Sequence, residues 1–211
     1  MKHYAIAEIQ GWSRIYRANF VNSLSGFKPV SLIATVNKAG QPNLAIFSNI
    51  VHLGADPALI GFINRPKEAA PHTIRNIEET GVYTINHILP AFVEKAHQTS
   101  AKYADDINEF DKVGLTATHK DGFVVPYVAE SHVQMALSLS EIIPLSNGTF
   151  LVVGALEHAY VNEESVANDG FIELAKEGSI VSSGLDAYYT TTPLQRFTYA
   201  KADQPLTEIT F

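Results

Sequence analysis

An arginine, a histidine and a threonine lie close together in the first third of the sequence, in a context that suits the binding of a phosphate group. Thr73 precedes apolar residues at helical spacing, and Gly81 stands where a left-handed helix end is expected, so residues 73–80 are predicted to form a short capped helix. The first turn of such a helix leaves backbone N–H groups unpaired, and its dipole attracts anions. Arg65 adds a bidentate donor for phosphate oxygens, and His72 is a candidate donor to the phosphate or to a substrate.

The same three residues also have a purely structural explanation. In this explanation Thr73 caps the helix and has no further role. Arg65 is a solvated loop residue, and His72 merely flanks the cap. Taken alone, Arg65 and Thr73 favour this structural explanation over a binding site.

The other ionisable residues point to no metal site and to no acid–base catalysis. The eight histidines form no H-E-x-x-H motif and no close group with carboxylates. Neighbouring carboxylates such as Asp105-Asp106 lie in polar stretches that are typical of solvated surfaces. The sequence contains no G-x-G-x-x-G between strand and helix, no G-x-x-x-x-G-K-[ST] and no G-x-S-x-G, so the usual dinucleotide, nucleoside-triphosphate and hydrolase motifs are all absent.

Composition narrows the class of protein further. The chain has 211 residues, no cysteine, a formal net charge of −7 and a pI near 5.6. Lack of cysteine excludes zinc ribbons, iron–sulfur clusters, catalytic thiols and disulfides, and is compatible with the cytoplasm. The acidic balance argues against nucleic-acid binding, and no apolar stretch is long enough to span a bilayer. We therefore expect a cytoplasmic protein with neither a nucleic-acid nor a membrane partner.

Hydrophobic periodicity and turn residues predict a mainly β protein. Ser146-Asn147-Gly148 indicates a tight hairpin between the last two predicted strands, and Gly40 lies in the link between the first two. Six strand-like runs joined mostly by hairpins favour an antiparallel barrel over a parallel α/β sheet. These runs cover residues 29–37, 42–53, 57–64, 82–88, 133–145 and 149–161.

Helices are predicted only at the periphery of this barrel. One begins at Arg14 and ends before Gly26, one begins at Pro90, and another covers residues 170–177. Residues 1–13 are expected to be an extended arm or an edge strand. No repeat or linker is evident, so we expect one domain over residues 1–211, with 163–211 as a C-terminal extension packed on the barrel or on a dimer partner.

Several segments occur in an order that is typical of one protein family. The first three are KPVSLIAT, NLAIFSNIVHLGADPALIGFIN and HTIRNIEETGVYTIN, and they are followed by ESHVQMALSL, VGALE and LDAYYTTTPLQRFTYA. This order resembles the flavin reductase-like family of FMN-binding split barrels, whose early runs read approximately RPIALVST, N-x-x-P-F-S, D-P-P, T-L-R-N-I and G-E-F-V-V-N. The resemblance covers roughly residues 15 to 202.

The resemblance implies a homodimer of six-stranded split β-barrels with peripheral helices, which holds FMN near the subunit interface. It assigns the flavin ring and ribityl chain to the first and second strands, and the phosphate to the loop and helix that follow the third strand. This assignment favours the binding explanation of Arg65 and Thr73 over the structural one. The implied cofactor-binding residues are Lys28, Pro29, Val30, Ser31, Ile46, Phe47, Ser48, Asn49, Asn64, Arg65 and Thr73.

The resemblance also implies the activity. We expect an FMN-dependent oxidoreductase, similar to NAD(P)H:flavin reductases, that passes electrons from a reduced donor such as NAD(P)H through FMN to a flavin or another small-molecule substrate. The alternative is a non-catalytic flavin-binding module for storage, sensing or partner binding, with Tyr188 and Tyr189 as residues that could cover the ring. A haem or other small-molecule binder on the same barrel is a third reading.

Two departures from the family pattern bear on activity. Lys28 stands where the family more often has arginine, which keeps the charge but removes a planar bidentate donor. Many flavin reductases have a G-D-H segment after the penultimate barrel strand, with its histidine near the nicotinamide. The matching positions read Ser146-Asn147-Gly148-Thr149 here, so the electron donor and the catalytic residues stay open.

Overall fold

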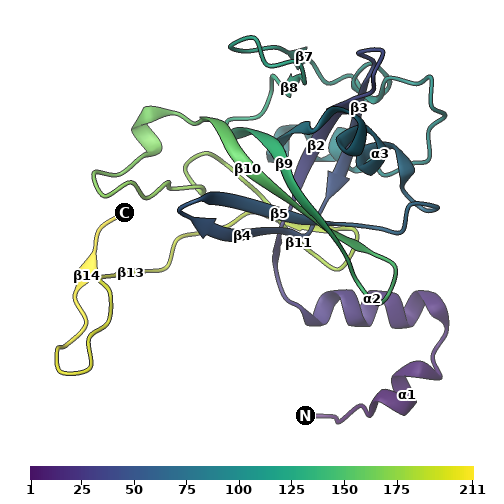
Figure 1. Ribbon diagram of the computed structural model, residues 1–211. Coiled ribbons are helices and arrows are strands. Elements are labelled where there is room, and N and C mark those ends of the chain that lie inside the picture. The colour runs from purple at the N-terminus through teal and green to yellow at the C-terminus, as the bar shows by residue number, and fades with distance from the viewer.

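A seven-stranded sheet forms the body of the molecule in the computed structural model, which describes all of residues 1–211 (Figure 1). Its strands lie in the order β3-β2-β6-β9-β10-β5-β4, and every neighbouring pair is antiparallel. The predicted antiparallel, mainly β class is therefore confirmed. The strands are β2 Ser31–Val36, β3 Pro42–Phe47, β4 Ile50–Ala55, β5 Ala58–Asn64, β6 Val82–His87, β9 Gln134–Pro144 and β10 Phe150–Tyr160.

The two edges of this sheet are joined by a very short connection. β3 and β4 are the opposite edge strands, yet only Ser48 and Asn49 separate them in the chain. Three trans peptide units span at most about 11 Å, so the sheet must curl until its two edges meet at this end. No ladder joins β3 to β4, which makes the sheet a curled, open barrel. The six-strand count is not confirmed, because the single run predicted at 42–53 is in fact two strands.

The curl gives the sheet two buried faces, each with its own core. All six residues of β2 are buried, and its alternation sends Leu32 to one face and Ile33 to the other. The Leu32 side packs against Phe92 and Phe110 from the peripheral helices. The Ile33 side packs with residues of β5, β6, β9, β10 and helix α3 in a second cluster, namely Phe62, Ile74, Ile77, Tyr83, Ile85, Leu137 and Val152.

Helix α3 (Pro71–Thr80) packs against β2 and β3 and begins earlier than the sequence predicted. Pro71 occupies its first position, where the missing N–H has no cost, and Ala70 is an N-cap without a side-chain hydrogen bond. Thr73 is therefore the third helical residue and not the cap. The predicted end is confirmed, because Gly81 adopts the left-handed conformation with φ of 75°.

The peripheral helices are partly as predicted. The helix expected at Pro90 is present as a 3-10 turn, Pro90–Phe92, followed by α4, Val93–Gln98. Helix α5, Glu109–Val113, was not predicted. The buried Glu109 carboxylate accepts a hydrogen bond from the backbone N–H of Leu44 at 3.1 Å and so attaches α5 to β3. Two short strands, β7 Ala117–Thr118 and β8 Tyr127–Val128, form a separate ribbon.

Both ends of the chain extend away from the sheet (Figure 1). The helix predicted at Arg14 is confirmed as α2, Arg14–Leu24, but the predicted arm or edge strand at 1–13 is wrong, since it contains helix α1, Ile6–Gln10. The helix predicted at 170–177 is absent; Ile172 forms an isolated bridge with Val166, and residues 174–177 form a turn. No helix combines the length and the apolar character that crossing a membrane requires.

The C-terminal segment returns to the beginning of the sheet before it leaves the body. Strand β1, Lys28–Pro29, pairs with β11, Val181–Ser183, which pairs with β12, Ala187–Tyr189. This ribbon therefore lies beside the start of β2. Beyond it the chain forms an arm that carries the small hairpin of β13, Arg196–Phe197, and β14, Glu208–Ile209.

The contact that Tyr83 of β6 makes across β9 with Gly154 of β10 yields a first prediction, because it requires a glycine. A Cβ atom at Gly154 would collide with the hydroxyl of Tyr83 and lie 3.1 Å from Cβ of Leu137. We expect Gly154→Ala to lower the free energy of unfolding by about 1–3 kcal/mol in urea titrations. The Tyr83 hydroxyl is buried without a partner, so Tyr83→Phe should cost little and should rescue part of the loss in the double variant, since the ring carbon Cζ still lies 2.9 Å from the added Cβ atom. A double variant as unstable as Gly154→Ala alone would contradict this explanation.

Candidate functional site

The structure brings the first two predicted flavin-binding segments together. β2 and β3 pair so that Ser31 lies opposite Phe47 and Leu32 opposite Ile46. Residues 28–31 and 46–49 therefore meet at one end of the sheet, which is also the end where its two edges approach. Ser31 and Val30 are buried, Ser48 is half-buried, and Asn49 is exposed.

The third predicted segment, at the end of β5, adjoins the second. The carbonyl oxygen of Asn49 accepts a hydrogen bond from the N–H of Ile63 at 3.3 Å, and Asn64 follows directly. Asn64 is fully buried, and its Nδ2 donates to the carbonyl oxygens of Arg65 at 2.7 Å and Ala70 at 3.5 Å. These bonds hold the loop that leads to α3. The Asn64 Oδ1 atom is buried and has no hydrogen-bond partner within the chain.

Arg65 and Thr73, the two predicted phosphate ligands, lie in different surroundings. Arg65 is exposed and takes part in no ion pair, so its guanidinium is free to bind an anion. Thr73 is only 3% exposed, and its hydroxyl accepts a hydrogen bond from Asn43 Nδ2 at 3.4 Å. Asn43 lies four residues before Phe47 on β3, so the Thr73 hydroxyl is directed toward the hairpin end of β2 and β3. Its backbone still belongs to the first turn of α3.

The side chain of Lys28 has a structural role. Its Nζ donates to the carbonyl oxygen of Asn22 at 2.7 Å and to the Ser25 hydroxyl at 3.3 Å. These acceptors lie at the C-terminal end of α2, where a cation complements the helix dipole. Lys28 can therefore line a flavin through its backbone, while its charge holds α2.

His87 is a residue that sequence reasoning did not place in the site. It lies opposite Ser31 across the β2–β6 ladder, and its Nδ1 forms a hydrogen bond with the Ser179 hydroxyl at 2.9 Å. Burial lowers the pKa of His87 to about 4, so its ring is neutral at pH 7. The pairing with Ser31 is a tertiary contact that no local pattern reveals.

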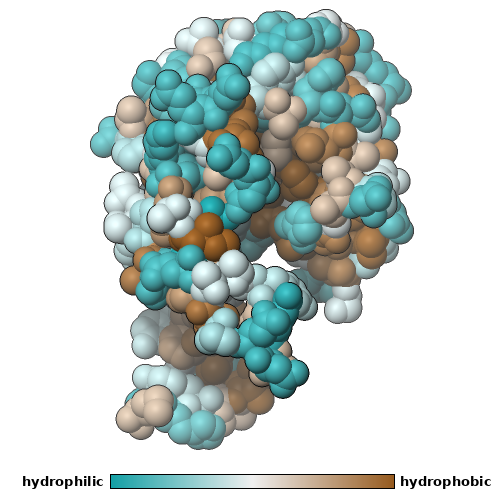
Figure 2. Space-filling view, turned by 90° about the vertical axis from the view of Figure 1, so that its left-hand side faces the viewer, coloured by the Kyte–Doolittle hydropathy of each residue, from teal (hydrophilic) through white to brown (hydrophobic).

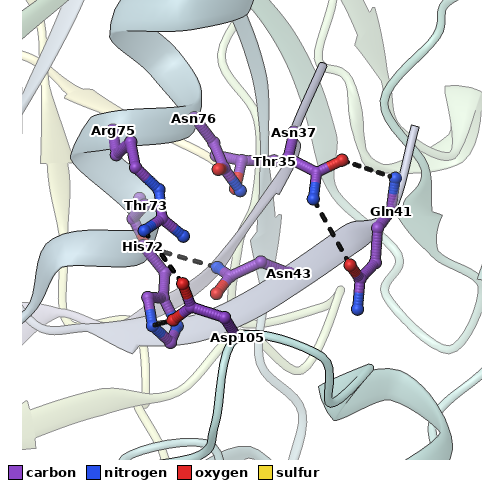
Figure 3. A network of polar contacts seen from close by, with 9 residues as sticks. All are labelled: Thr35, Asn37, Gln41, Asn43, His72, Thr73, Arg75, Asn76 and Asp105. Atoms are coloured by element: carbon purple, nitrogen blue, oxygen red, sulfur yellow. Dashed lines mark hydrogen bonds and ion pairs between the residues drawn. The ribbon is translucent and has the colours of Figure 1, made fainter. Parts of the chain in front are cut away.

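The histidine that sequence reasoning did single out has a different partner from the one expected. His72 Nε2 lies 2.6 Å from Oδ1 of Asp105, and Arg75 Nη1 lies 3.1 Å from Oδ2 of the same carboxylate (Figure 3). Arg75 and then His72 lower the pKa of this exposed carboxyl. Asp105 had been interpreted as part of a solvated face, and a separation of 30 residues from Arg75 gives no sequence signal for this contact. No group of three or more histidine and carboxylate side chains is placed to ligate a metal.

The residues at the edge of the sheet suit a flavin nucleotide by their chemistry. An unpaired guanidinium at Arg65 matches a phosphate group, and the buried Oδ1 of Asn64 matches a hydroxyl donor such as a ribityl group. Half-buried apolar side chains at Ile46 and Phe47 offer a surface for a ring system. The site therefore combines an anion-binding end, a polar middle and an apolar end.

A curled antiparallel sheet with this edge-to-edge connection defines the split-barrel class, and solved structures share it. A candidate flavin reductase with a split barrel domain from Shewanella frigidimarina NCIMB 400 is 43% identical, with a TM-score of 0.91 over 95% of this chain and 100% of its own. The 2-nitrobenzoate 2-nitroreductase NbaA of Pseudomonas fluorescens is 21% identical, with a TM-score of 0.80 over 97% and 98% of the two chains. This second likeness shows the fold alone.

The family follows from the sequence as well. Residues 26–175 match the family model described as "Flavin reductase like domain", and the chain belongs to this flavin reductase-like family. An uncharacterised protein of Aquifex aeolicus (strain VF5) is 27% identical over 120 residues, which are 56% of this chain and 61% of that protein. The match thus spans less than two thirds of this relative. The resemblance stated from the sequence is confirmed.

The neutral state of His87 yields a second prediction. Because its pKa is about 4 in the folded protein and 6.5 in the unfolded chain, only the unfolded chain takes up this proton between those values. The stability that depends on the neutral His87 ring is therefore fully present above pH 6.5 and is lost as the pH falls toward 4. We expect His87→Gln to abolish about 2 kcal/mol of the drop in unfolding free energy between pH 7 and pH 5. Urea titrations at both pH values measure this drop, and equal drops in the two proteins would contradict the prediction.

Proposed function

We propose that this protein is an FMN-binding oxidoreductase that passes electrons from a reduced donor through FMN to a flavin or another small-molecule acceptor. The observation that carries the proposal is the convergence of the segments at 28–31, 46–49 and 64–65 at the end of the sheet where its two edges meet, in a member of the flavin reductase-like family. Bound FMN would supply hydride-accepting and electron-passing chemistry. The residues of the chain would bind and orient it.

Each part of the site would have a distinct task. The Arg65 guanidinium would hold the phosphate, and the first-turn N–H groups of α3 would add to it. Oδ1 of Asn64 would accept a hydrogen bond from the ribityl chain, while Ser48 and Asn49 would bind polar atoms at the ring edge. The backbone of Lys28 to Ser31 and the apolar side chains of Ile46 and Phe47 would line the ring.

We propose NAD(P)H as the reduced donor. We also propose that the protein acts in the cytoplasm, with which its cysteine-free composition is compatible. The hairpin that bears a histidine in many flavin reductases is a short polar turn in this protein. Oδ1 of Asn147 accepts hydrogen bonds from the N–H and the hydroxyl of Thr149, at 3.1 and 2.7 Å. The polar side chains of this turn therefore bond to one another. Other groups would have to position the nicotinamide of NAD(P)H.

A non-catalytic flavin-binding module is the second candidate, and one observation favours it. The ribbon of β1, β11 and β12 places Tyr189 against Phe27, with ring centroids 4.9 Å apart, directly beside Lys28. Tyr188 is held by a hydrogen bond of 2.6 Å between its hydroxyl and His97 Nδ1. These two tyrosines would restrict access to a flavin ring bound beside Lys28. Reduction of bound FMN by NADH or NADPH no faster than that of free FMN, in stopped-flow absorbance, would select this candidate.

Retention of FMN and its dependence on Arg65 form the third prediction. We expect the purified protein to retain flavin absorption after FMN is added and the excess removed. Arg65→Ala should weaken FMN binding by about 1.5–3 kcal/mol, because it removes a charge-assisted contact to the phosphate. Fluorescence titration with FMN measures this loss. Riboflavin, which lacks the phosphate, should bind both proteins equally.

Lys67→Ala is the matched control for Arg65→Ala. It removes the same charge two residues away, but Lys67 is paired with Glu78 at 2.6 Å and is not a predicted ligand. FMN affinity should stay unchanged in this variant. Equal losses in the two variants would show a general charge effect and would move the phosphate away from Arg65.

We propose further that the protein works as a homodimer, because its surface is too large for a compact monomer. The accessible surface is 12485 Å², whereas roughly 9,700 Å² is usual for a monomer of 23.1 kDa. The excess, roughly 2,800 Å², is comparable to what one chain contributes to a large obligate interface. Helix α2 has no buried residue, and Ile15 and Leu24 on it are 75% and 66% exposed.

The exposed apolar side chains lie partly on the N-terminal helices, where Ile6, Tyr16 and Val21 are also exposed. Figure 2 shows apolar side chains among polar ones on the lower part of the molecule, at the height where Figure 1 draws α1 and α2. The C-terminal arm is similarly uncovered, with Leu194 89% and Tyr199 92% exposed. A second copy of the chain would cover both arms. The interface would then adjoin the flavin residues, because α2 leads directly into Lys28 through Phe27.

The oligomeric state provides the fourth prediction. Light scattering after size exclusion should give twice the chain mass of 23.1 kDa. Ile15→Glu combined with Leu24→Glu should shift the protein to a monomer, since burying two carboxylates in an interface is strongly unfavourable. Ala117→Glu adds a charge on β7, at the other end of the molecule in Figure 1, and should leave the mass unchanged. A monomeric parent protein would contradict the proposal.

A further inference from the structure

A strap of the C-terminal segment, residues 177–183, crosses one end of the sheet. Nδ1 of His132, just before β9, donates a hydrogen bond to the carbonyl oxygen of Glu177 at 3.1 Å. The N–H of Ile180 donates to the carbonyl oxygen of Ile88, just after β6, at 3.1 Å. Farther along the strap, β11 pairs with β1. The strap thus runs from the start of β9 past the end of β6 to β1, the strand that opens the predicted flavin site.

His87, the last residue of β6, lies in a row with two of the predicted flavin-binding residues. Ser31 of β2 is paired with Phe47 of β3 on one side and with His87 on the other. Residues directly opposite one another in a ladder point to the same face of the sheet, with Cβ atoms about 5 Å apart. This face carries Ile33, and the Phe47 ring packs there against Phe62 at a centroid distance of 4.9 Å. A ring system held against Ser31 and Phe47 would therefore lie within one strand spacing of His87, about 5 Å.

One nitrogen of the His87 ring is bonded and the other is free. Nδ1 shares a hydrogen bond of 2.9 Å with the hydroxyl of Ser179, which lies in the strap and is 8% exposed. Nε2 makes no hydrogen bond within the chain and, unlike the hydroxyl of Tyr83, is not fully buried. His87 as a whole is half-buried. Nε2 is therefore open to a ligand, while the strap fixes the orientation of the ring.

The Ser179 hydroxyl can also fix which nitrogen carries the proton. Burial lowers the pKa of His87 to about 4, so the ring holds a single N–H at pH 7. When the Ser179 hydroxyl donates to Nδ1, this N–H must be at Nε2. His87 then presents a neutral donor to the site. The polar edge of a flavin ring consists mainly of carbonyl oxygens and ring nitrogens that accept hydrogen bonds, so this tautomer suits it.

We propose that Ser179 holds His87 in the tautomer with the proton on Nε2, and that this N–H donates a hydrogen bond to the polar edge of the bound flavin ring. This role of His87 rests on the proposed function and extends it to the redox balance of the same site. The ring gains negative charge at this edge on reduction, and a hydrogen bond to a charged acceptor is roughly twice as strong as one to a neutral acceptor. His87 therefore favours reduced over oxidised flavin. Ser179 acts on the flavin only through His87 and is a positioning residue.

Nitrogen NMR of the histidine rings tests the tautomer and the contact without any turnover. In the full chain at pH 7, the His87 signals, identified by their loss in His87→Phe, should show a protonated Nε2 and an unprotonated Nδ1. Ser179→Ala should produce a mixture of the two tautomers. Saturating riboflavin, which lacks the phosphate, should shift the Nε2 signal of His87 and leave that of His132 unchanged. The opposite tautomer, or riboflavin binding without a shift at His87, would overturn the proposal.

The reduction potential of bound FMN tests the consequence. In His87→Phe, the affinity for reduced FMN relative to oxidised FMN should fall about tenfold, which lowers the potential of a two-electron couple by about 30 mV. Ser179→Ala should give a smaller shift in the same direction. His132→Phe is the matched control, because it removes the other histidine that contacts the strap, and it should leave the potential unchanged. Equal shifts in His87→Phe and His132→Phe would show that the strap, and not the hydrogen bond, determines the potential.

Flavin retention separates failure of this role from failure of the proposed function. A parent protein that retains no flavin absorption contradicts the proposed function and the role of His87 together. Retained flavin with an unchanged potential in His87→Phe contradicts the role of His87 alone. Thermal unfolding without flavin checks that each variant is folded. Ser179→Ala removes only a hydroxyl group, so it still tests the tautomer and the potential if His87→Phe does not fold.

Discussion

The two-residue connection between β3 and β4 is the constraint on which the rest of the structure depends. Since Ser48 and Asn49 must join opposite edges of a seven-stranded sheet, the sheet has to curl, and the curl encloses the Ile33 side of β2 as a second core. It also brings the end of β3, the start of β4 and the end of β5 to one place. A polar dipeptide inside an apolar run is therefore both the corner of the fold and part of the candidate site.

The sequence predicted the strands and the order of the site segments because both depend on local patterns. Alternation and Ser146-Asn147-Gly148 identify β9 and β10 correctly, and Gly81 marks the end of α3. The corner at Ser48-Asn49 was missed as a strand break, because Asn-containing runs with apolar flanks are compatible with a continuous strand. The helix predicted at 170–177 failed for a similar reason, since tertiary contacts decide such short segments.

The site contains contacts that no spacing could reveal. His87 meets Ser31 only because β6 is inserted next to β2, and Asp105 reaches His72 and Arg75 only because α5 is anchored to β3 through Glu109. Lys28 shows the reverse case, in which a residue correctly placed beside the site has its charge directed elsewhere, to the end of α2. Position along the chain predicted proximity, but the partner of each side chain depended on packing.

Helix α3 is held on the sheet by polar bonds as well as by apolar packing. Its buried face carries polar residues as well as Ile74 and Ile77, and these polar residues bond to the hairpin of β2 and β3, Asn76 to Thr35 and Thr73 to Asn43. These bonds fix the direction of the helix, so its N-terminal end stays close to the loop after β5 and to Arg65. The other side of the helix start carries His72 and Arg75, whose partly exposed side chains bind the Asp105 carboxylate. Because the bonds of Thr73 and Asn76 are buried and those to Asp105 are not, the position of α3 on the sheet depends on the buried bonds.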